Sequence, residues 1–194
     1  MLALIQCENT SANELAQILR QIDEPFIITG SESEVYKADK VILYGSGSAM
    51  QNMKKLHMWN LFSLLRLIKK PILGIGLGVE LMCDRTAGEN VSCLGLFPID
   101  SNKIEDKGAL YSHSGLKKIE ILQKSRLFEG IDAESEFFFS ESYFLPENKY
   151  TTSIVENREK YSASMERNNA FGVQFHPEKS GEAGLILIKN FLNL

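Results

Sequence analysis

The strongest constraint on the fold comes from residues 71–85, which read PILGIGLGVELMCDR. Ile72–Ile75 is an apolar run long enough for one buried strand, and glycines occupy positions 74, 76 and 78. Val79–Asp84 then predicts the start of a helix. A strand, a tight glycine turn and a helix together raise one residue above the carboxyl end of a parallel sheet, over helix N–H groups. Here that residue is Gly76, which has no side chain for chemistry.

Strand and helix patterns alternate through the first 85 residues. Strands are predicted at Met1–Gln6, Pro25–Thr29 and Val41–Leu43, the last running into the loop Tyr44-Gly45-Ser46-Gly47-Ser48. Between the first two, Ser11 and Glu14 form a capping box, and one helix face carries Leu15, Ile18, Leu19 and Ile22. A helical region with a break near His57 leads to Pro71. This alternation predicts right-handed crossovers and a parallel sheet.

The pattern changes after about Glu89. Short aromatic or β-branched runs separated by turn residues predict antiparallel or mixed strands beside the parallel core. They are Lys117–Leu122, Glu136–Phe144, Thr151–Val155, Tyr161–Glu166 and Phe171–Phe175. A last helix is predicted at Glu182–Leu192, with Leu185, Ile188 and Leu192 on one side. We therefore expect an α/β fold with a mostly parallel central sheet flanked by helices.

Composition limits the partners and the compartment. With 194 residues, 44% of them hydrophobic, we expect a single domain over residues 1–194. The net charge of −4 argues against nucleic acid or an anionic membrane surface, and no apolar run is long enough for a membrane span. The start, MLALIQCENT, lacks the features of a signal peptide. Cys7, Cys83 and Cys93 lack metal-ligand spacing, so we expect buried thiols of a cytoplasmic protein, with no metal and no cofactor.

A second chemical pattern lies at the end of the last predicted strand, in GVQFHPEKS at residues 172–180. A histidine at a strand end, followed two residues later by a carboxylate, can serve as a base and its orienting group. His176 and Glu178 have this spacing, and Pro177 stiffens the connection. The spacing alone also fits a solvated loop, but His176 lies 100 residues after the Gly76 turn. The glycines at 74, 76 and 78 do not match a dinucleotide-binding fingerprint, because position 79 is Val.

GVQFHPEKS, the GIGLG turn and the YGSGS loop together resemble the class I (triad) glutamine amidotransferases. The nearest branch is the glutaminase subunit of imidazole glycerol phosphate synthase, in histidine biosynthesis, and the resemblance covers residues 1–194. It implies a flavodoxin-like amidotransferase core that releases ammonia from glutamine. It also implies that the partner is a (β/α)₈-barrel cyclase, docked over the active-site face in a heterodimer.

The resemblance assigns roles to individual positions. His176 and Glu178 correspond to the base and its orienting carboxylate. Gly45, Ser46 and Gly47 correspond to the oxyanion loop, in which Tyr44 and Ser46 replace a proline and a valine. The backbone N–H of Leu77 corresponds to a second oxyanion donor. Ser142 and Tyr143 match two of three residues that frame the amino-acid end of the substrate glutamine.

Several positions depart from the family pattern. Gly76 replaces the nucleophilic cysteine, Glu80 replaces a glutamine that contacts substrate, and Glu141 replaces the histidine before Ser-Tyr. Gly115-Leu116-Lys117 corresponds to a Gly-Trp-Asn stretch. Cys83 should lie about two helical turns beyond Gly76, and Cys7 and Cys93 belong to other elements, so none replaces the missing thiol. Loss of one triad member predicts a loss of several orders of magnitude in activity.

Three functional hypotheses remain open on the sequence. The first is a synthase subunit without intrinsic glutaminase activity, in effect a pseudoenzyme. The second is an active enzyme whose cysteine has been removed by substitution, although Glu80 and Glu141 would then be unexplained. The third is a repurposed binding module for a cationic or amine ligand, with a partner in a pathway such as surface-sugar amidation.

Overall fold

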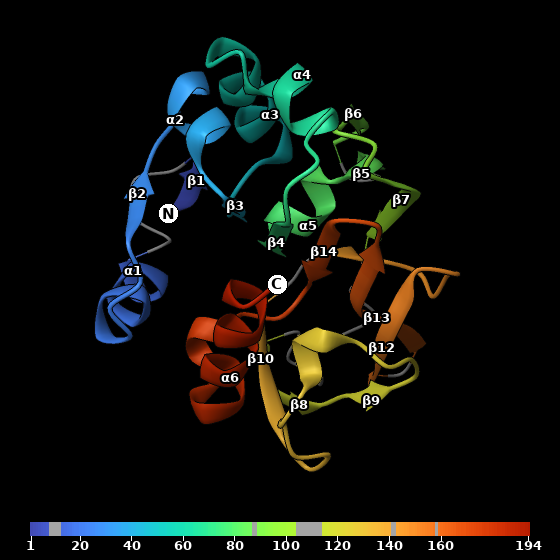
Figure 1. Ribbon diagram of the computed structural model, residues 1–194. Coiled ribbons are helices and arrows are strands. Elements are labelled where there is room, and N and C mark those ends of the chain that lie inside the picture. Colours follow the sequence, from blue (N-terminus) through green and yellow to red (C-terminus); the bar gives the residue numbers. More distant parts are fainter. Residues whose placement is uncertain (8–12, 87–88, 104–113, 141–142, 158) are drawn as a thin grey trace.

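A computed structural model describes residues 1–7, 13–86, 89–103, 114–140, 143–157 and 159–194. Its centre is an eight-stranded sheet with strand order β2-β1-β3-β4-β14-β13-β12-β9 (Figure 1). The strands are β1 (Leu2–Gln6), β2 (Phe26–Ile28), β3 (Lys40–Gly45), β4 (Ile72–Gly76), β9 (Glu120–Ile121), β12 (Thr151–Asn157), β13 (Glu159–Arg167) and β14 (Ala170–Val173).

Five strands of this sheet form a parallel half, and the other three are antiparallel. Strands β2, β1, β3, β4 and β14 pair in parallel, in the strand order of a flavodoxin-like doubly wound sheet. Strands β13, β12 and β9 extend it with antiparallel pairs. The predicted parallel core with a mixed region beside it is therefore confirmed.

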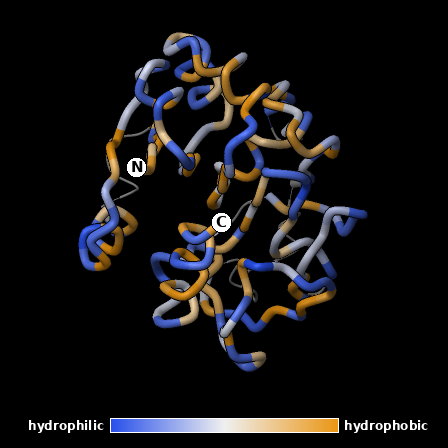
Figure 2. The backbone as a smooth tube through the Cα atoms, in the orientation of Figure 1, coloured by the Kyte–Doolittle hydropathy of each residue, from blue (hydrophilic) through white to orange (hydrophobic). Residues whose placement is uncertain are grey.

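Helices cover both faces of the parallel half. They are α1 (Asn13–Gln21), α2 (Glu32–Lys37), α3 (Ala49–Met58), α4 (Leu61–Arg66), α5 (Leu77–Leu81) and α6 (Gly181–Leu192). Buried residues of α2 to α5 form one apolar cluster with one face of the sheet, and those of α1 and α6 form a second cluster with the other face. Along the helices of Figure 2, hydrophobic and hydrophilic residues alternate, as expected for helices with one buried side.

The strands show why both faces are covered. In β3, Val41 and Leu43 belong to the first cluster, whereas Ile42 and Tyr44 belong to the second. Because successive strand side chains point to opposite faces, a continuous apolar run is what a strand buried on both faces requires. The predicted break near His57 is confirmed, since Asn60 separates α3 from α4 with a positive φ of 57°.

Two smaller sheets flank the central one, and the sequence did not predict their layout. One pairs β10 (Glu136–Ser140) with β8 (Ser114–Lys118), and the other has the order β11-β7-β5-β6. The latter contains β5 (Cys83–Thr86), β6 (Val91–Ser92), β7 (Phe97–Lys103) and β11 (Tyr143–Phe144). The single strands predicted at Lys117–Leu122 and Glu136–Phe144 are therefore wrong, because each range contributes to two sheets. Two one-turn 3₁₀ helices, η1 (Arg126–Phe128) and η2 (Pro177–Lys179), complete the described elements.

Two local predictions around the glycine turns need correction. The helix predicted at Val79–Asp84 is α5, which begins at Leu77 and ends at Leu81. Cys83 then enters β5, because its carbonyl accepts from Gly95 N–H and its strand pairs with β7. Tyr44 and Gly45 were predicted in a loop but are the last residues of β3, in register with β4.

The glycines around the turn allow α5 to lie directly against two strands. A Cβ added at Gly78 would lie 1.9 Å from the carbonyl oxygen of Leu43 in β3. A Cβ added at Gly74 would lie 2.7 Å from Cα of Val79 and 2.5 Å from the sulfur of Met82. All three distances are far inside van der Waals contact, so only glycine permits this approach. The first turn of α5 is thereby held beside the ends of β3 and β4.

Candidate functional site

Three neighbouring parallel strands end at one edge of the central sheet, and each supplies part of the candidate site. Strand β3 ends in Tyr44-Gly45, β4 ends in Gly76, and β14 leads through Phe175 to His176. Gly45 pairs with Gly76 in the β3–β4 register. In doubly wound sheets, ligands bind in the crevice outside the carboxyl ends of the strands.

Gly76 forms a turn whose backbone conformation would be strained in a residue with a side chain. Its φ is 58° and its ψ is −125°, a conformation that residues with a Cβ rarely adopt. A Cβ added there would lie 3.3 Å from Nε2 and 3.1 Å from Cε1 of His176, and 3.5 Å from the carbonyl oxygen of Gly45. A side chain at position 76 would therefore point at the imidazole, which would yield by a few tenths of an ångström.

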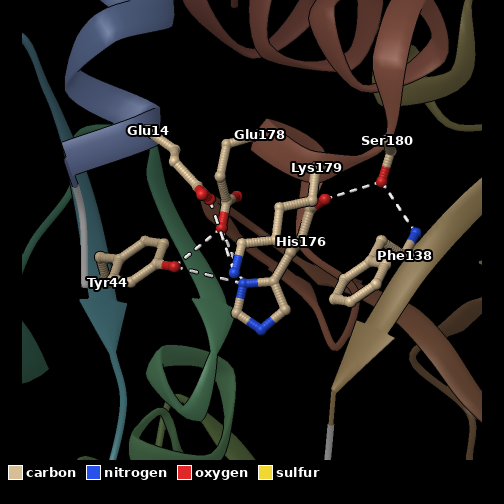
Figure 3. A network of polar contacts seen from close by, with 7 residues as sticks. All are labelled: Glu14, Tyr44, Phe138, His176, Glu178, Lys179 and Ser180. Carbon is tan, nitrogen blue, oxygen red and sulfur yellow. Dashed lines mark hydrogen bonds and ion pairs between the residues drawn. The ribbon is translucent and has the colours of Figure 1, made fainter. Parts of the chain in front are cut away.

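The opposite nitrogen of His176 faces a buried carboxylate (Figure 3). His176 Nδ1 lies 2.7 Å from Oε1 of Glu178, whose side chain is fully buried. A proton on Nδ1 would donate to Glu178 and leave Nε2, the nitrogen that faces position 76, as an acceptor. The arrangement is that of a base and its orienting carboxylate, aimed at a position that lacks a nucleophile.

Tyr44 is a third member of this cluster, and its contact with Glu178 was not predicted. Its hydroxyl donates to Glu178 Oε1 over 2.7 Å and lies 3.3 Å from His176 Nδ1. Burial and the neighbouring Glu178 carboxylate raise the pKa of Tyr44 well above its usual value, so the hydroxyl stays a donor. Its place at the end of β3, beside β4, is the feature from which this contact could have been anticipated.

The turn that carries Glu178 is fixed to its neighbours by backbone contacts. His176 N–H donates to Phe138 O in β10. Phe138 N–H donates to Ser180 Oγ, which itself donates to His176 O (Figure 3). On its other side, η2 meets α6, where a Cβ at Gly184 would lie 1.8 Å from Pro177 O. The HPEKS stretch is therefore a rigid connection, which keeps Glu178 beside His176.

The loop after β3 is oriented by Asn52 of α3, another residue that the sequence did not indicate. Asn52 is buried, and its Nδ2 donates to the carbonyl oxygens of Ser46, over 2.9 Å, and Ser48, over 2.7 Å. Because C=O and N–H point in opposite directions across a trans peptide, the N–H of Gly47 points away from Asn52. Gly47 has a φ of 72°, which suits glycine.

The remaining predicted positions lie around α5 and β11. Leu77 is the first residue of α5, directly after Gly76. Glu80 is buried in α5, with Oε2 3.4 Å from the hydroxyl of Ser101 in β7. Tyr143 lies in β11, where its carbonyl accepts from the side-chain amide of Gln174. Glu141 and Ser142 lie outside the described residues.

The cysteines lie apart from the turn. All three cysteines are buried, and burial is the largest cause that raises the pKa of Cys93 to about 12 and that of Cys83 well above its usual value. Cys83 lies in β5 rather than on a helix, and its thiol donates to Val79 O. Within the described residues, no cluster of histidines, cysteines and carboxylates could hold a metal ion. In the same residues, no helix is long and apolar enough to cross a membrane.

A profile of the family "Glutamine amidotransferase class-I" matches residues 4–194. The chain belongs to the class I glutamine amidotransferases. Subunits named imidazole glycerol phosphate synthase subunit HisH are similar over most of its length. The protein from Buchnera aphidicola is 35% identical over 97% of this chain and 95% of its own. The Bacteroides fragilis protein is 34% identical over 99% and 98%, and the Escherichia coli protein is 38% identical over 82% of each chain.

Solved structures support the same fold. A structure described as a glutamine amidotransferase has a TM-score of 0.76 at 12% identity, covering 98% of this chain and 97% of that one. A Thermoplasma acidophilum protein described as part of a GMP synthase has a TM-score of 0.72 at 18% identity, covering 100% and 93%. The expected class I glutamine amidotransferase fold is thus confirmed.

Proposed function

We propose that this amidotransferase-family chain is the glutaminase-type subunit of an imidazole glycerol phosphate synthase-like complex, and that it does not itself hydrolyse glutamine. The observation that carries the second part is the glycine at position 76. A family enzyme attacks the amide of glutamine with the cysteine sulfur at this turn, while the histidine takes the thiol proton. Here the imidazole faces the same place, but no side chain is present to be activated.

The first part of the proposal rests on the relatives. Those named HisH are 31% to 38% identical and cover between 82% and 100% of this chain. We therefore propose a cytoplasmic heterodimer with a (β/α)₈-barrel cyclase, as the resemblance implies. In this complex the chain would cover the cyclase and shape the entrance through which ammonia reaches it. Synthesis would then depend on free ammonia rather than on glutamine.

Turnover of the reconstituted complex tests this proposal. We expect ammonium salts to support synthesis, whereas glutamine gives a rate lower by about 10⁴-fold or more than in an intact enzyme, the scale of loss when a triad member is removed. The E. coli relative with its own cyclase is the positive control. Glutamine-dependent turnover by this chain that disappears in a His176→Ala variant would refute the proposal.

A second candidate function rests on Glu80. It introduces a buried carboxylate at a position where the family has a glutamine that contacts substrate. A carboxylate there would favour the amine of a ligand and disfavour a second carboxylate. The pocket could then serve a cationic or amine ligand, with a partner in another pathway such as surface-sugar amidation.

Thermal denaturation with small amines, glutamine and other amino acids distinguishes this candidate. We expect a simple amine to raise the melting temperature more than glutamine does, and a Glu80→Gln variant to reverse that order, because the substitution removes the charge and keeps the shape. An unchanged melting temperature with every small ligand, alongside stabilisation by the cyclase, would reject the candidate.

A further inference from the structure

We infer that Tyr44 is a positioning residue, which holds the Glu178 carboxylate and thereby aims Nε2 of His176 at position 76. The inference adds to the proposed function and does not depend on the cyclase or on glutamine. It begins from the way the two oxygens of Glu178 are used. Oε1 accepts from Tyr44 and contacts His176 Nδ1, each over 2.7 Å, whereas the buried Oε2 has no hydrogen bond within the described residues.

A carboxylate held through one oxygen can rotate about its last bond unless a second contact fixes it. The Tyr44 hydroxyl supplies that contact from the neighbouring strand, and the tyrosine is itself only 2% exposed. Its ring is packed in the apolar cluster beneath α1 and α6, so the hydroxyl has little freedom to move. Glu178 Oε1 is therefore held from two sides, by Tyr44 of β3 and by His176, which follows β14.

The charged groups around the Tyr44–Glu178 hydrogen bond explain why the tyrosine hydroxyl is the donor. Glu14 of α1 lies near the cluster and pairs with Lys179 over 3.5 Å, so the groups facing Tyr44 are two carboxylates, one ammonium and the imidazole. A phenol hydroxyl among carboxylates remains protonated and donates. The side chain of Phe138 brings no charge to the His176 side, and its ring centroid lies 6.4 Å from that of the imidazole.

This arrangement has a chemical consequence for any thiol at position 76. The thiol proton would pass to His176 Nε2, and the resulting thiolate would be stabilised by the imidazolium, itself held by Glu178. Both the orientation of the His176 ring and the stabilisation of the imidazolium charge depend on Glu178 keeping its position. Removing the Tyr44 hydroxyl should therefore lower the ionised fraction of a thiol at position 76 without changing the packing around that thiol.

Alkylation of an introduced thiol measures this directly. In a Gly76→Cys variant, iodoacetamide reacts with the thiolate, forming an S–C bond and releasing iodide. At pH 6 an ordinary thiol, with a pKa near 8.5, is less than about 1% ionised, whereas a thiol paired with histidine can be largely ionised. We expect the Gly76→Cys variant to react at least about 10-fold faster at pH 6 than an unpaired thiol, and addition of Tyr44→Phe to remove most of that advantage.

The pH profile separates positioning from a merely structural effect. At pH 10 the thiol ionises without help, so the rates with and without Tyr44→Phe should converge, whereas altered packing would slow the reaction at both pH values. Tyr161→Phe is the matched control, because Tyr161 is 4% exposed in the same cluster and its hydroxyl contacts Lys117 instead. Equal rates with and without the Tyr44 hydroxyl at pH 6, or an equal loss with Tyr161→Phe, would overturn the inference.

A second measurement keeps the inference testable if Gly76→Cys does not fold. In the parent chain, the imidazole ¹⁵N chemical shifts should show the proton of neutral His176 on Nδ1. Tyr44→Phe should accelerate solvent exchange of that proton at least several-fold, because Glu178 is then held by one contact fewer. The same exchange rate in both chains would contradict the role of Tyr44.

Discussion

A Gly76→Cys variant in complex with the proposed cyclase is expected to hydrolyse glutamine at least about a thousandfold faster than the parent chain, because removal of one triad member costs roughly 10⁴- to 10⁶-fold. The base is already aimed, since a Cβ at this position lies 3.3 Å from His176 Nε2. Ammonia release at saturating glutamine is the measurement. Gly76→Ala is the matched control, because it adds the same Cβ without the sulfur and should remain inactive.

The size of the gain also tests how much Glu80 contributes. Adding Glu80→Gln to Gly76→Cys should lower the KM for glutamine and leave kcat nearly unchanged, because the buried charge acts on binding rather than on the attacking sulfur. No gain from Gly76→Cys, in a variant whose new thiol is readily alkylated, would contradict the proposal that the missing sulfur is the main defect.

Gly78→Ala is expected to lower the free energy of unfolding by about 3 kcal/mol, the upper end of the usual cost of overpacking a core. The added Cβ would lie 1.9 Å from Leu43 O, a backbone atom of a central strand that cannot turn aside as a side chain can. Ordinarily an alanine favours a helix over glycine by about 1 kcal/mol, so the sign of the effect is informative. Urea unfolding of both chains provides the measurement.

Gly130→Ala is the control for backbone conformation alone. Gly130 has a φ of 75°, but an added Cβ meets nothing within 4 Å. We expect a cost of about 1 to 2 kcal/mol there, from the left-handed conformation. If Gly78→Ala cost no more than Gly130→Ala, the close approach of α5 to β3 would not be the constraint that we describe.

Local sequence patterns predicted the parallel core because each of its strands is a short apolar run between helix or turn residues. The spacing of His176 and Glu178 similarly indicated a base with its orienting carboxylate, and a contact between them needs only residues close in the chain. These features are local, so the sequence contains the whole pattern.

Contacts between residues that are distant in the sequence were harder to predict. Tyr44 is 132 residues from His176, and the YGSGS stretch indicates only that Tyr44 follows a strand, not that its hydroxyl meets Glu178. Strand β5 was missed because GVELMCD reads as a continuing helix, whereas pairing with β7 ends α5 at Leu81. Asn52 gave no indication of its role, since a buried amide in a helix is recognisable only once its acceptors in the loop are known.

The three strand ends at residues 44–45, 76 and 176 have a consequence for how such a protein can change over time. Each chemical component lies at or just beyond the end of a different strand, and the contact between His176 and Glu178 does not involve the residue at position 76. During evolution, such a protein can therefore lose the reactive sulfur and keep the other groups of the site in place. A single codon change at position 76 would restore the sulfur.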